Sequence, residues 1–362
     1  MTQTFSKLRP SFLGSRSARR SQVVAIDLGS RSTKAVHIQR NGEGFDLLGY
    51  VIQEAPLYDK TPTPDLIAEH LRSVTQSLQA KTKLVTLVVG MGDSILRSVE
   101  LPPLPVSEMR LMLKVGTKNY LQQDLPDHTF DCFILAPTAV AAAKPGEPKL
   151  AQKYKVWVGG AKNQTVNDLQ KATRSAGLVP DQITLSALGP VNAFEKSHAD
   201  IFARDTVALV DIGFKNSTIS ILSHGELALS RVVATGGDKI TAGLSEALGI
   251  SYAEAESIKV GMPAEIESAL LPLVTPLGRE LRASIDFFEH QHEKMVAHVY
   301  LSGGGARSDF FIQSLQADLM LPCTQWNPTT ALNIALPAQQ AGEVAQIASQ
   351  LTVALGAAAG SF

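Results

Sequence analysis

The stretch VVAIDLGSRSTKAVHI, at Val23–Ile38, decides the fold, because its design returns as VALVDIGFKNSTISIL at Val207–Leu222. Each copy has an apolar run, an Asp-x-Gly step, a short polar turn and a second alternating run. This pattern predicts two strands joined by a tight turn. The aspartates of the two copies, Asp27 and Asp211, lie 184 residues apart, and no short-period repeat fills the interval. A duplication at this range predicts two related lobes, each opened by the same hairpin.

An Asp-x-Gly step at the end of a strand suits a phosphate-binding turn. Backbone N–H groups in such a turn point inward, and glycine allows close approach of a ligand. The aspartate can accept a hydrogen bond from a water on Mg²⁺, which keeps several waters and takes few protein ligands. The candidate residues are Asp27, Gly29, Ser30, Ser32, Thr33 and Lys34 in the first copy and Asp211, Gly213, Lys215 and Asn216 in the second. Facing hairpins would hold a triphosphate from both sides, with the two aspartates positioning magnesium and water. One hairpin alone is weak evidence, because ordinary turns favour the same residues.

Two other glycine segments have a related design. VYLSGGGARSDF at Val299–Phe310 predicts a strand, a glycine triplet and a helix, which would bring backbone amides and a helix N-terminus to a ligand. The triplet also lets a base or a ribose lie against the backbone. ATGGDKIT at Ala234–Thr241 follows the same logic. The candidate binding residues here are Gly236, Gly237, Lys239, Gly303, Gly304, Gly305 and Arg307. The simpler alternative is a tight connection between a strand and a helix.

Composition bounds the class of protein. Of 362 residues, 44% are hydrophobic and 19% charged, which predicts large cores and argues against wholesale disorder. The net charge of −1 gives no global field that would attract nucleic acid or a membrane. Cys132 and Cys323 have no metal-type spacing, and this usage suits a reducing compartment. No apolar run approaches the roughly 20 residues of a membrane helix.

Changes in charge, helix caps and proline-rich stops along the chain predict its division into segments. The first 22 residues hold five basic residues and no acidic one, which predicts a disordered tail or, alternatively, an arm that touches anionic lipid or an acidic partner. A helix begins at Pro64 with Thr63 as its N-cap. LPPLP at Leu101–Pro105 is a stop, after which a helix capped by Ser107 opens an α-β-β-α-β block. We predict the tail over 1–22, lobe I over 23–103, the block as an insert over 104–186, a return to lobe I over 187–204, lobe II over 205–340, and a small-residue C-terminal helix over 341–362 that packs back on lobe I.

The order of hairpin, insert, hairpin, Gly-Gly turn and glycine triplet resembles the actin, sugar-kinase and Hsp70 ATPase superfamily. A closer resemblance is to the PilM family, actin-like proteins of type IV pilus assembly related to the division protein FtsA. It runs through nearly the whole chain after the tail, in AIDLGSRSTKAV, LPPLPVSEMRLMLKVGTKNYL, VGGAKNQTVNDLQKATRSAGLVPDQI, VDIGFKNSTISIL, GGDKIT, ELRASIDFF and LSGGGARS. The resemblance implies an α/β, actin-like fold: a duplicated, ribonuclease H-like, two-lobed ATPase with an α+β subdomain of the 1C type at the insert.

The resemblance also implies a function. It implies a cytoplasmic scaffold, peripheral at the inner membrane, that binds ATP and Mg²⁺. The partner it implies is the cytoplasmic N-terminal peptide of a PilN-like membrane protein, docked between the insert and lobe I. Glu280 and Arg282 would border the nucleotide base, and Arg110, Met112 and Tyr120 would line the peptide groove. Pilus motor ATPases and further copies of the chain are additional partners that the resemblance implies.

The second turn departs from the family pattern. Catalytic members often carry Gly-Gly-Thr after Asp-x-Gly, where this chain reads Phe214-Lys215-Asn216-Ser217-Thr218. Thr218 lies seven residues past Asp211 and Thr33 six past Asp27, which predicts a second turn one residue longer than the first. Phe214 adds bulk where a phosphate would approach, and Lys215 either meets the phosphate charge or is solvated.

This departure supports ATP binding better than efficient hydrolysis, and we expect at most a slow ATPase. Two alternatives stay open. One is a small-molecule kinase of the same superfamily, acting on a sugar or an acid, for which the sequence identifies no general base. The other is a nucleotide-free adaptor, which the bulk of Phe214 favours.

Overall fold

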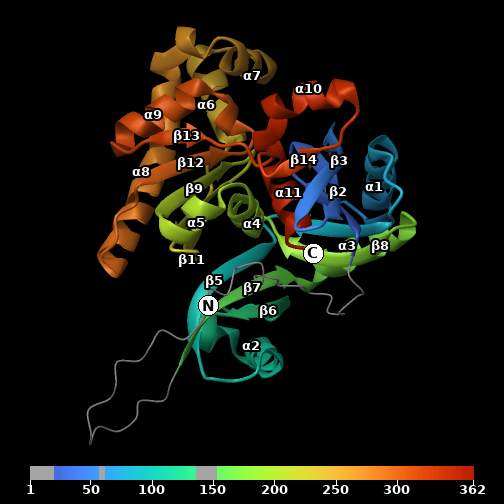
Figure 1. Cartoon of the computed structure of the whole chain (residues 1–362). Helices are drawn as coiled ribbons and strands as arrows, with labels where there is room; N and C mark the ends of the chain where they lie inside the picture. The colour runs from blue at the N-terminus through green and yellow to red at the C-terminus, as the bar shows by residue number, and fades with distance from the viewer. Residues whose placement is uncertain (1–19, 57–61, 136–152) are drawn as a thin grey trace, which may run out of the picture.

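The computed structural model describes residues 20–56, 62–135 and 153–362. Figure 1 shows two lobes side by side with a smaller subdomain below them. Each lobe is built on a mixed sheet that contains one of the two predicted hairpins. The predicted two-lobed α/β fold is therefore confirmed. The predicted basic tail lies outside the described residues up to residue 19.

Lobe I is organised around the first hairpin. Its six strands, in spatial order, are β14 (Leu332–Ile334), β3 (Gly44–Glu54), β2 (Ser32–Asn41), β1 (Gln22–Leu28), β4 (Leu84–Val89) and β8 (Val179–Leu185). The first three strands of the chain form an antiparallel meander, and β4 lies parallel to β1. The strand β14 pairs with β3, so the chain has returned to lobe I before residue 340, where we placed the end of lobe II.

Alternation along β1 gives lobe I two cores, because successive side chains of a strand point to opposite faces. Val24 and Ile26 pack in one cluster with the helices α1 (Pro64–Leu78) and α3 (Asn163–Ser175). The opposite face packs against the C-terminal helix α11 (Thr352–Ala359), which also lies along α4 (Leu188–Ser197). The hairpin is thereby buried on both sides, which fixes the position of its turn.

Helix starts follow the local rules in one case and not in another. Thr63 caps α1 as predicted, and its hydroxyl accepts from the amide of Leu66. The predicted cap at Ser107 is wrong, because α2 (Val106–Leu121) has Pro105 at its N-cap, two residues earlier. Pro105 precedes it with its φ fixed near the helical value, and its carbonyl accepts from the amide of Met109.

Lobe II repeats the plan with the second hairpin. Its five strands, in spatial order, are β11 (Glu226–Val233), β10 (Ser217–Ser223), β9 (Thr206–Ile212), β12 (His298–Ser302) and β13 (Cys323–Gln325). Its helices are α6 (Gly237–Leu248), α7 (Tyr252–Gly261), α8 (Glu267–His292) and α9 (Asp309–Leu319), with 3₁₀ turns at η1 (Pro263–Ile266) and η2 (Gly305–Arg307). Buried side chains of β9, β10 and β12 share one core cluster with α8 and α9.

The remaining elements are α4 (Leu188–Ser197), α5 (Ala199–Arg204), α10 (Ala338–Ile347) and η3 (Ala348–Leu351). Of these, α4 and η3 contact strands of both lobes. The ring of Phe194 on α4 meets the ring of Trp326 edge-on at 5.2 Å between centroids, which ties α4 to lobe II. Across the described ranges, no helix combines the length and the hydropathy that crossing a bilayer requires.

The small subdomain differs in extent from the predicted insert. It is a three-stranded antiparallel sheet in the order β5 (Ser94–Leu101), β7 (Tyr154–Lys162) and β6 (His128–Ile134), covered by α2. We placed 94–103 in lobe I and 163–186 in the insert, and strand pairing reverses both assignments. The strand β8 pairs in parallel with β4, and α3 packs on α1, because a long-range pairing decides which sheet a strand joins.

Candidate functional site

The two hairpins have turns of equal length. Leu28 pairs with Thr33 in the first hairpin, and Ile212 pairs with Ser217 in the second. The turns are therefore residues 29–32 and 213–216, and the prediction of a longer second turn is wrong. The error came from matching Thr218 to Thr33, whereas the register matches Ser217 to Thr33.

The aspartates of the two hairpins are both partly buried and lie close enough for their charges to interact. Lys34 lies opposite Asp27 in the strand register, with its Nζ 3.8 Å from Asp27 Oδ2, and the Asp27 side chain is 14% exposed. Burial raises the pKa of Asp27, and the Lys34 charge opposes this shift. Burial also raises the pKa of Asp211 to about 6, against a hydrogen bond from Ser302 Oγ at 2.8 Å. The negative charge of Asp27 raises the pKa of Asp211 further, so the two carboxylates lie within electrostatic reach of each other.

The glycine triplet begins beside this carboxylate pair. Ser302 ends β12 directly opposite Asp211 on β9, and Gly303 follows at a φ of +86°. A Cβ atom on Gly303 would lie 2.5 Å from the carbonyl oxygen of Ile212, so glycine is required for both its φ and its contact. The triplet therefore lies against the second hairpin, with Gly304 exposed.

The Gly236–Gly237 turn lies against the second hairpin as well. The amide of Gly237 donates to the carbonyl of Gly213 at 3.0 Å, and the amide of Asp238 donates to the carbonyl of Phe214 at 2.9 Å. A Cβ atom on Gly236 would lie 2.3 Å from the Phe214 oxygen. The start of α6 is thereby fixed to the second turn, and Lys215 Nζ contacts Asp238 Oδ2 at 2.6 Å.

Sequence analysis missed a polar cluster on α7. Lys259 Nζ lies 2.6 Å from Glu256 Oε2, 2.6 Å from Thr241 Oγ1 and 3.4 Å from the carbonyl of Gly237. Burial opposes ionisation of Glu256, but its bonds to Lys259 and Thr241 and the charges of Lys259 and Arg31 lower its pKa overall. The available signal was the Glu-x-x-Lys spacing in SYAEAESIKVG, which places both side chains on one helix face beside the Gly-Gly turn.

The other predicted phosphate residues divide into two groups. Thr33 is buried and shares a hydrogen bond of 2.8 Å with His70 on α1, so its hydroxyl serves lobe I. The carbonyl of Asn216 accepts from the amide of Gly213 across the second turn. The remaining predicted residues at the turns and helix starts are at least partly accessible: Gly29, Ser30, Ser32, Lys239, Gly305 and Arg307.

Glu280 and Arg282, the pair predicted to border a base, both have partners within lobe II. Glu280 Oε2 forms an ion pair with Arg231 of β11 at 2.6 Å. Arg282 donates to the carbonyls of Asp318 and Leu319 at the end of α9. In the described residues, the ion pair of Glu280 and the hydrogen bonds of Arg282 lie within lobe II and do not involve the carboxylate pair. Helix periodicity identifies α8 but not the direction in which each charged side chain turns.

The predicted peptide-binding residues belong to the body of the small subdomain. Arg110 Nε donates to Asp131 Oδ1 at 2.8 Å, and Met112 and Tyr120 pack against the core under α2. The apolar side chains that α2 presents to solvent are instead Leu111, 65% exposed, and Val115, 91% exposed.

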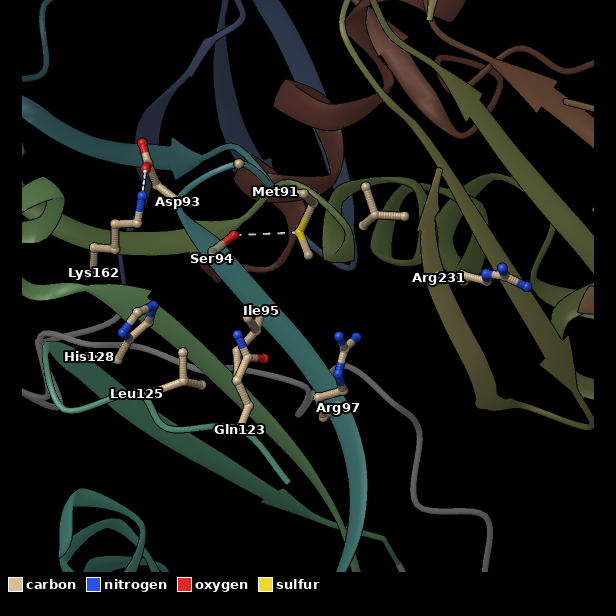
Figure 2. A pocket seen from close by; sticks show the side chains of 12 residues that line it. Met91, Asp93, Ser94, Ile95, Arg97, Gln123, Leu125, His128, Lys162 and Arg231 are labelled. Atoms are coloured by element: carbon tan, nitrogen blue, oxygen red, sulfur yellow. Dashed lines mark hydrogen bonds and ion pairs between the residues drawn. The ribbon is translucent and has the colours of Figure 1, made fainter. Parts of the chain in front are cut away.

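A pocket of ≈ 630 Å³ lies where the small subdomain meets both lobes. Figure 2 shows Met91 on the connection from lobe I, Arg97 on β5, Leu125 and His128 from the small subdomain, and Arg231 on β11. None of the three predicted peptide-binding residues lines this pocket. Its lining is mostly polar and includes the cationic residues Arg97, Lys162 and Arg231, and neither carboxylate of the pair belongs to it.

The two lobes, their paired Asp-x-Gly hairpins and the glycine turns packed on the second hairpin define a protein of the actin-like ATPase fold. A family model described as type IV pilus assembly protein PilM matches residues 25–362. The chain therefore belongs to the PilM family.

Solved structures agree on the fold. The chain is similar to a structure of a PilM–PilN type IV pilus biogenesis complex, with a TM-score of 0.81 and 21% identity over 95% of this chain and 100% of that one. It is also similar to the ethanolamine utilization protein EutJ from Carboxydothermus hydrogenoformans, with a TM-score of 0.55 and 14% identity over 94% of this chain and 90% of that one. MreB 5 of Spiroplasma citri bound to AMPPNP gives a TM-score of 0.50 and 11% identity over 94% and 95% of the two chains.

A curated relative matches a shorter segment. The cell division protein FtsA of Bacillus subtilis (strain 168) is 33% identical over 94 residues. These residues make up 26% of this chain and 21% of that protein.

Proposed function

We propose that the protein is an ATP-binding, actin-like scaffold of type IV pilus assembly at the cytoplasmic face of the inner membrane. It docks the N-terminal segment of a PilN-like membrane protein. The observation that carries the nucleotide site is the pairing of Asp27 and Asp211 from opposite lobes, next to glycine turns that leave no room for a side chain. Family membership supports the assembly role.

The residues present fit a magnesium nucleotide. Two buried carboxylates with raised pKa values form a site that a cation would complete, and Mg²⁺ needs few protein ligands because it keeps its waters. When bound, the ion would neutralise phosphate charge. Lys34 and the turn amide of Gly29 would hold phosphate oxygens, and Glu256 and Lys259 of α7 would hold the sugar side of the ligand. We expect no more than slow hydrolysis.

Calorimetry with ATP and ADP, each with and without Mg²⁺, tests the nucleotide site. We expect saturable binding that depends on magnesium and is weakened in Asp27→Ala and Asp211→Ala. Absence of binding to the wild-type protein would identify a nucleotide-free adaptor instead. Phosphate transfer to any sugar or small acid in the same preparations would identify a kinase.

The pocket at the small subdomain is the proposed seat of the partner segment. Its lining residues come from the small subdomain and from both lobes, so binding of an occupant would depend on how these three parts are arranged. A complex between PilM and PilN proteins exists in a solved structure with the same fold. An extended segment with polar or acidic side chains would suit this mostly polar lining, in which Arg97 and Arg231 are cationic.

Fluorescence titration with a peptide from the cytoplasmic start of the PilN-like protein tests the docking site. We expect saturable binding at micromolar concentrations that Arg97→Glu weakens, because Arg97 is an exposed pocket residue. Arg40→Glu is the matched control, since Arg40 is exposed on β2 away from the pocket. Equal affinities of the two variants would exclude this pocket as the seat.

A further inference from the structure

The tips of the two hairpin turns meet through a cation and an aromatic ring. Arg31, in the lobe I turn, places its guanidinium carbon 5.5 Å from the ring centroid of Phe214 in the lobe II turn. This distance lies within the range of a cation–π contact. The aromatic bulk that distinguishes the second turn therefore faces the opposite lobe.

The backbone of Phe214 is held in place by its neighbours. The Phe214 carbonyl accepts from the amide of Asp238, and Gly236 packs so closely on that carbonyl that a Cβ atom there would clash. Lys215 Nζ also lies 5.4 Å from the ring centroid, but it is held by Asp238 at 2.6 Å. A change at this contact must therefore come from the Arg31 side.

Arg31 is the partner that a ligand can draw away from the contact. It is exposed at the turn, and in the described part of the chain no carboxylate forms an ion pair with its guanidinium. The Arg31 charge nevertheless acts on Glu256 of α7, so the side chain reaches toward lobe II. A planar guanidinium is suited to bind two phosphate oxygens at once.

We propose that Arg31 and Phe214 form a latch between the hairpins, and that a nucleoside polyphosphate opens the latch by drawing the guanidinium onto its phosphate groups. The proposal rests on the nucleotide site argued above. An exposed cation–π contact favours the arrangement in which the two turns are in contact by about two- to fivefold over the arrangement in which they are apart. A charge-assisted hydrogen bond to phosphate is stronger than this contact, so the ligand displaces the ring.

The latch itself is tested without nucleotide, by hydrogen exchange of the amides at 29–33 and 213–217. Arg31→Gln and Phe214→Leu should each raise exchange at both turns by about two- to fivefold. The double variant should exchange no faster than the single ones, because the same contact is lost. Arg40→Gln, exposed on β2, is the matched control and should leave both turns unchanged. Unchanged exchange in either latch variant, or multiplicative effects in the double variant, would overturn the latch.

The release step is tested by calorimetry with magnesium ATP. Phe214→Leu should bind about two- to fivefold more tightly than the wild type, because the phosphates no longer compete with the ring. Arg31→Gln should bind at least about fivefold more weakly, because it loses a charged donor. An unchanged affinity in Arg31→Gln would overturn the release step while the proposed nucleotide site stands. A wild type that binds no nucleotide would overturn that site and the release step together, and exchange without nucleotide would still decide the latch.

Discussion

Replacement of Asp211 by asparagine should stabilise the nucleotide-free protein at neutral pH. Asp211 is the penultimate residue of β9 and is partly buried, where Ser302 donates to Oδ1 and the charge of Asp27 is repulsive. Asparagine has the same shape and a side-chain oxygen that can accept the same bond from Ser302. The substitution therefore removes a buried negative charge and leaves the packing in place.

The magnitude follows from the pKa of about 6, raised from 3.8 chiefly by burial. The folded protein holds a proton that the unfolded chain has already released, so the free energy of unfolding falls as the pH rises between these values. About two pKa units correspond to roughly 3 kcal/mol, and the free energy of unfolding has fallen by this full amount at pH 7.5. At pH 5 only about half of the loss has developed. Asp211→Asn should therefore gain about 3 kcal/mol at pH 7.5 and about 1.5 kcal/mol at pH 5.

Hydrogen exchange of the β9 and β12 amides measures this gain within lobe II, without assuming that the whole chain unfolds in one step. Asp205→Asn is the matched control, because Asp205 is exposed at the other end of β9. The same samples should show that magnesium nucleotide protects the wild type and not Asp211→Asn. A variant no more stable than the wild type at pH 7.5, or a gain that is equal at both pH values, would refute the reasoning.

Three further outcomes follow from the same geometry. Asp27→Asn should lower the pKa of Asp211 below about 6, measured by ¹³C carboxyl titration; an unchanged value would mean that the two carboxylates do not interact. Gly303→Ala should lower the stability of lobe II by about 1–3 kcal/mol because of its positive φ alone, and a backbone clash adds to this loss. Faster hydrogen exchange in β12 would measure the loss. Exchange equal to that of the wild type would contradict the close contact. Arg110→Met should destabilise the small subdomain by roughly 1–3 kcal/mol, because it weakens the compensation of the buried Asp131 charge. Limited proteolysis of α2 would detect that loss, and Asp131→Asn in the same background should reduce it.

The sequence alone determined the features that depend on neighbouring residues. Two Asp-x-Gly hairpins, the glycine triplet before a helix and the Thr63 cap are local patterns, and the structure contains all of them. Their order along the chain carried the resemblance to the actin-like family, and that resemblance implied the duplicated two-lobed fold.

Only the tertiary structure decided which distant elements meet. The strand β8 joined lobe I rather than the insert, since its pairing with β4 is a contact between segments far apart in the chain. Register, not residue type, matched Ser217 to Thr33. The contact of Arg31 with Phe214 and the cluster of Lys259 at Gly237 depend on how the lobes and helices pack. Side-chain direction at such sites is set by packing against the opposite lobe, and a periodic pattern within one segment carries no information about that surface.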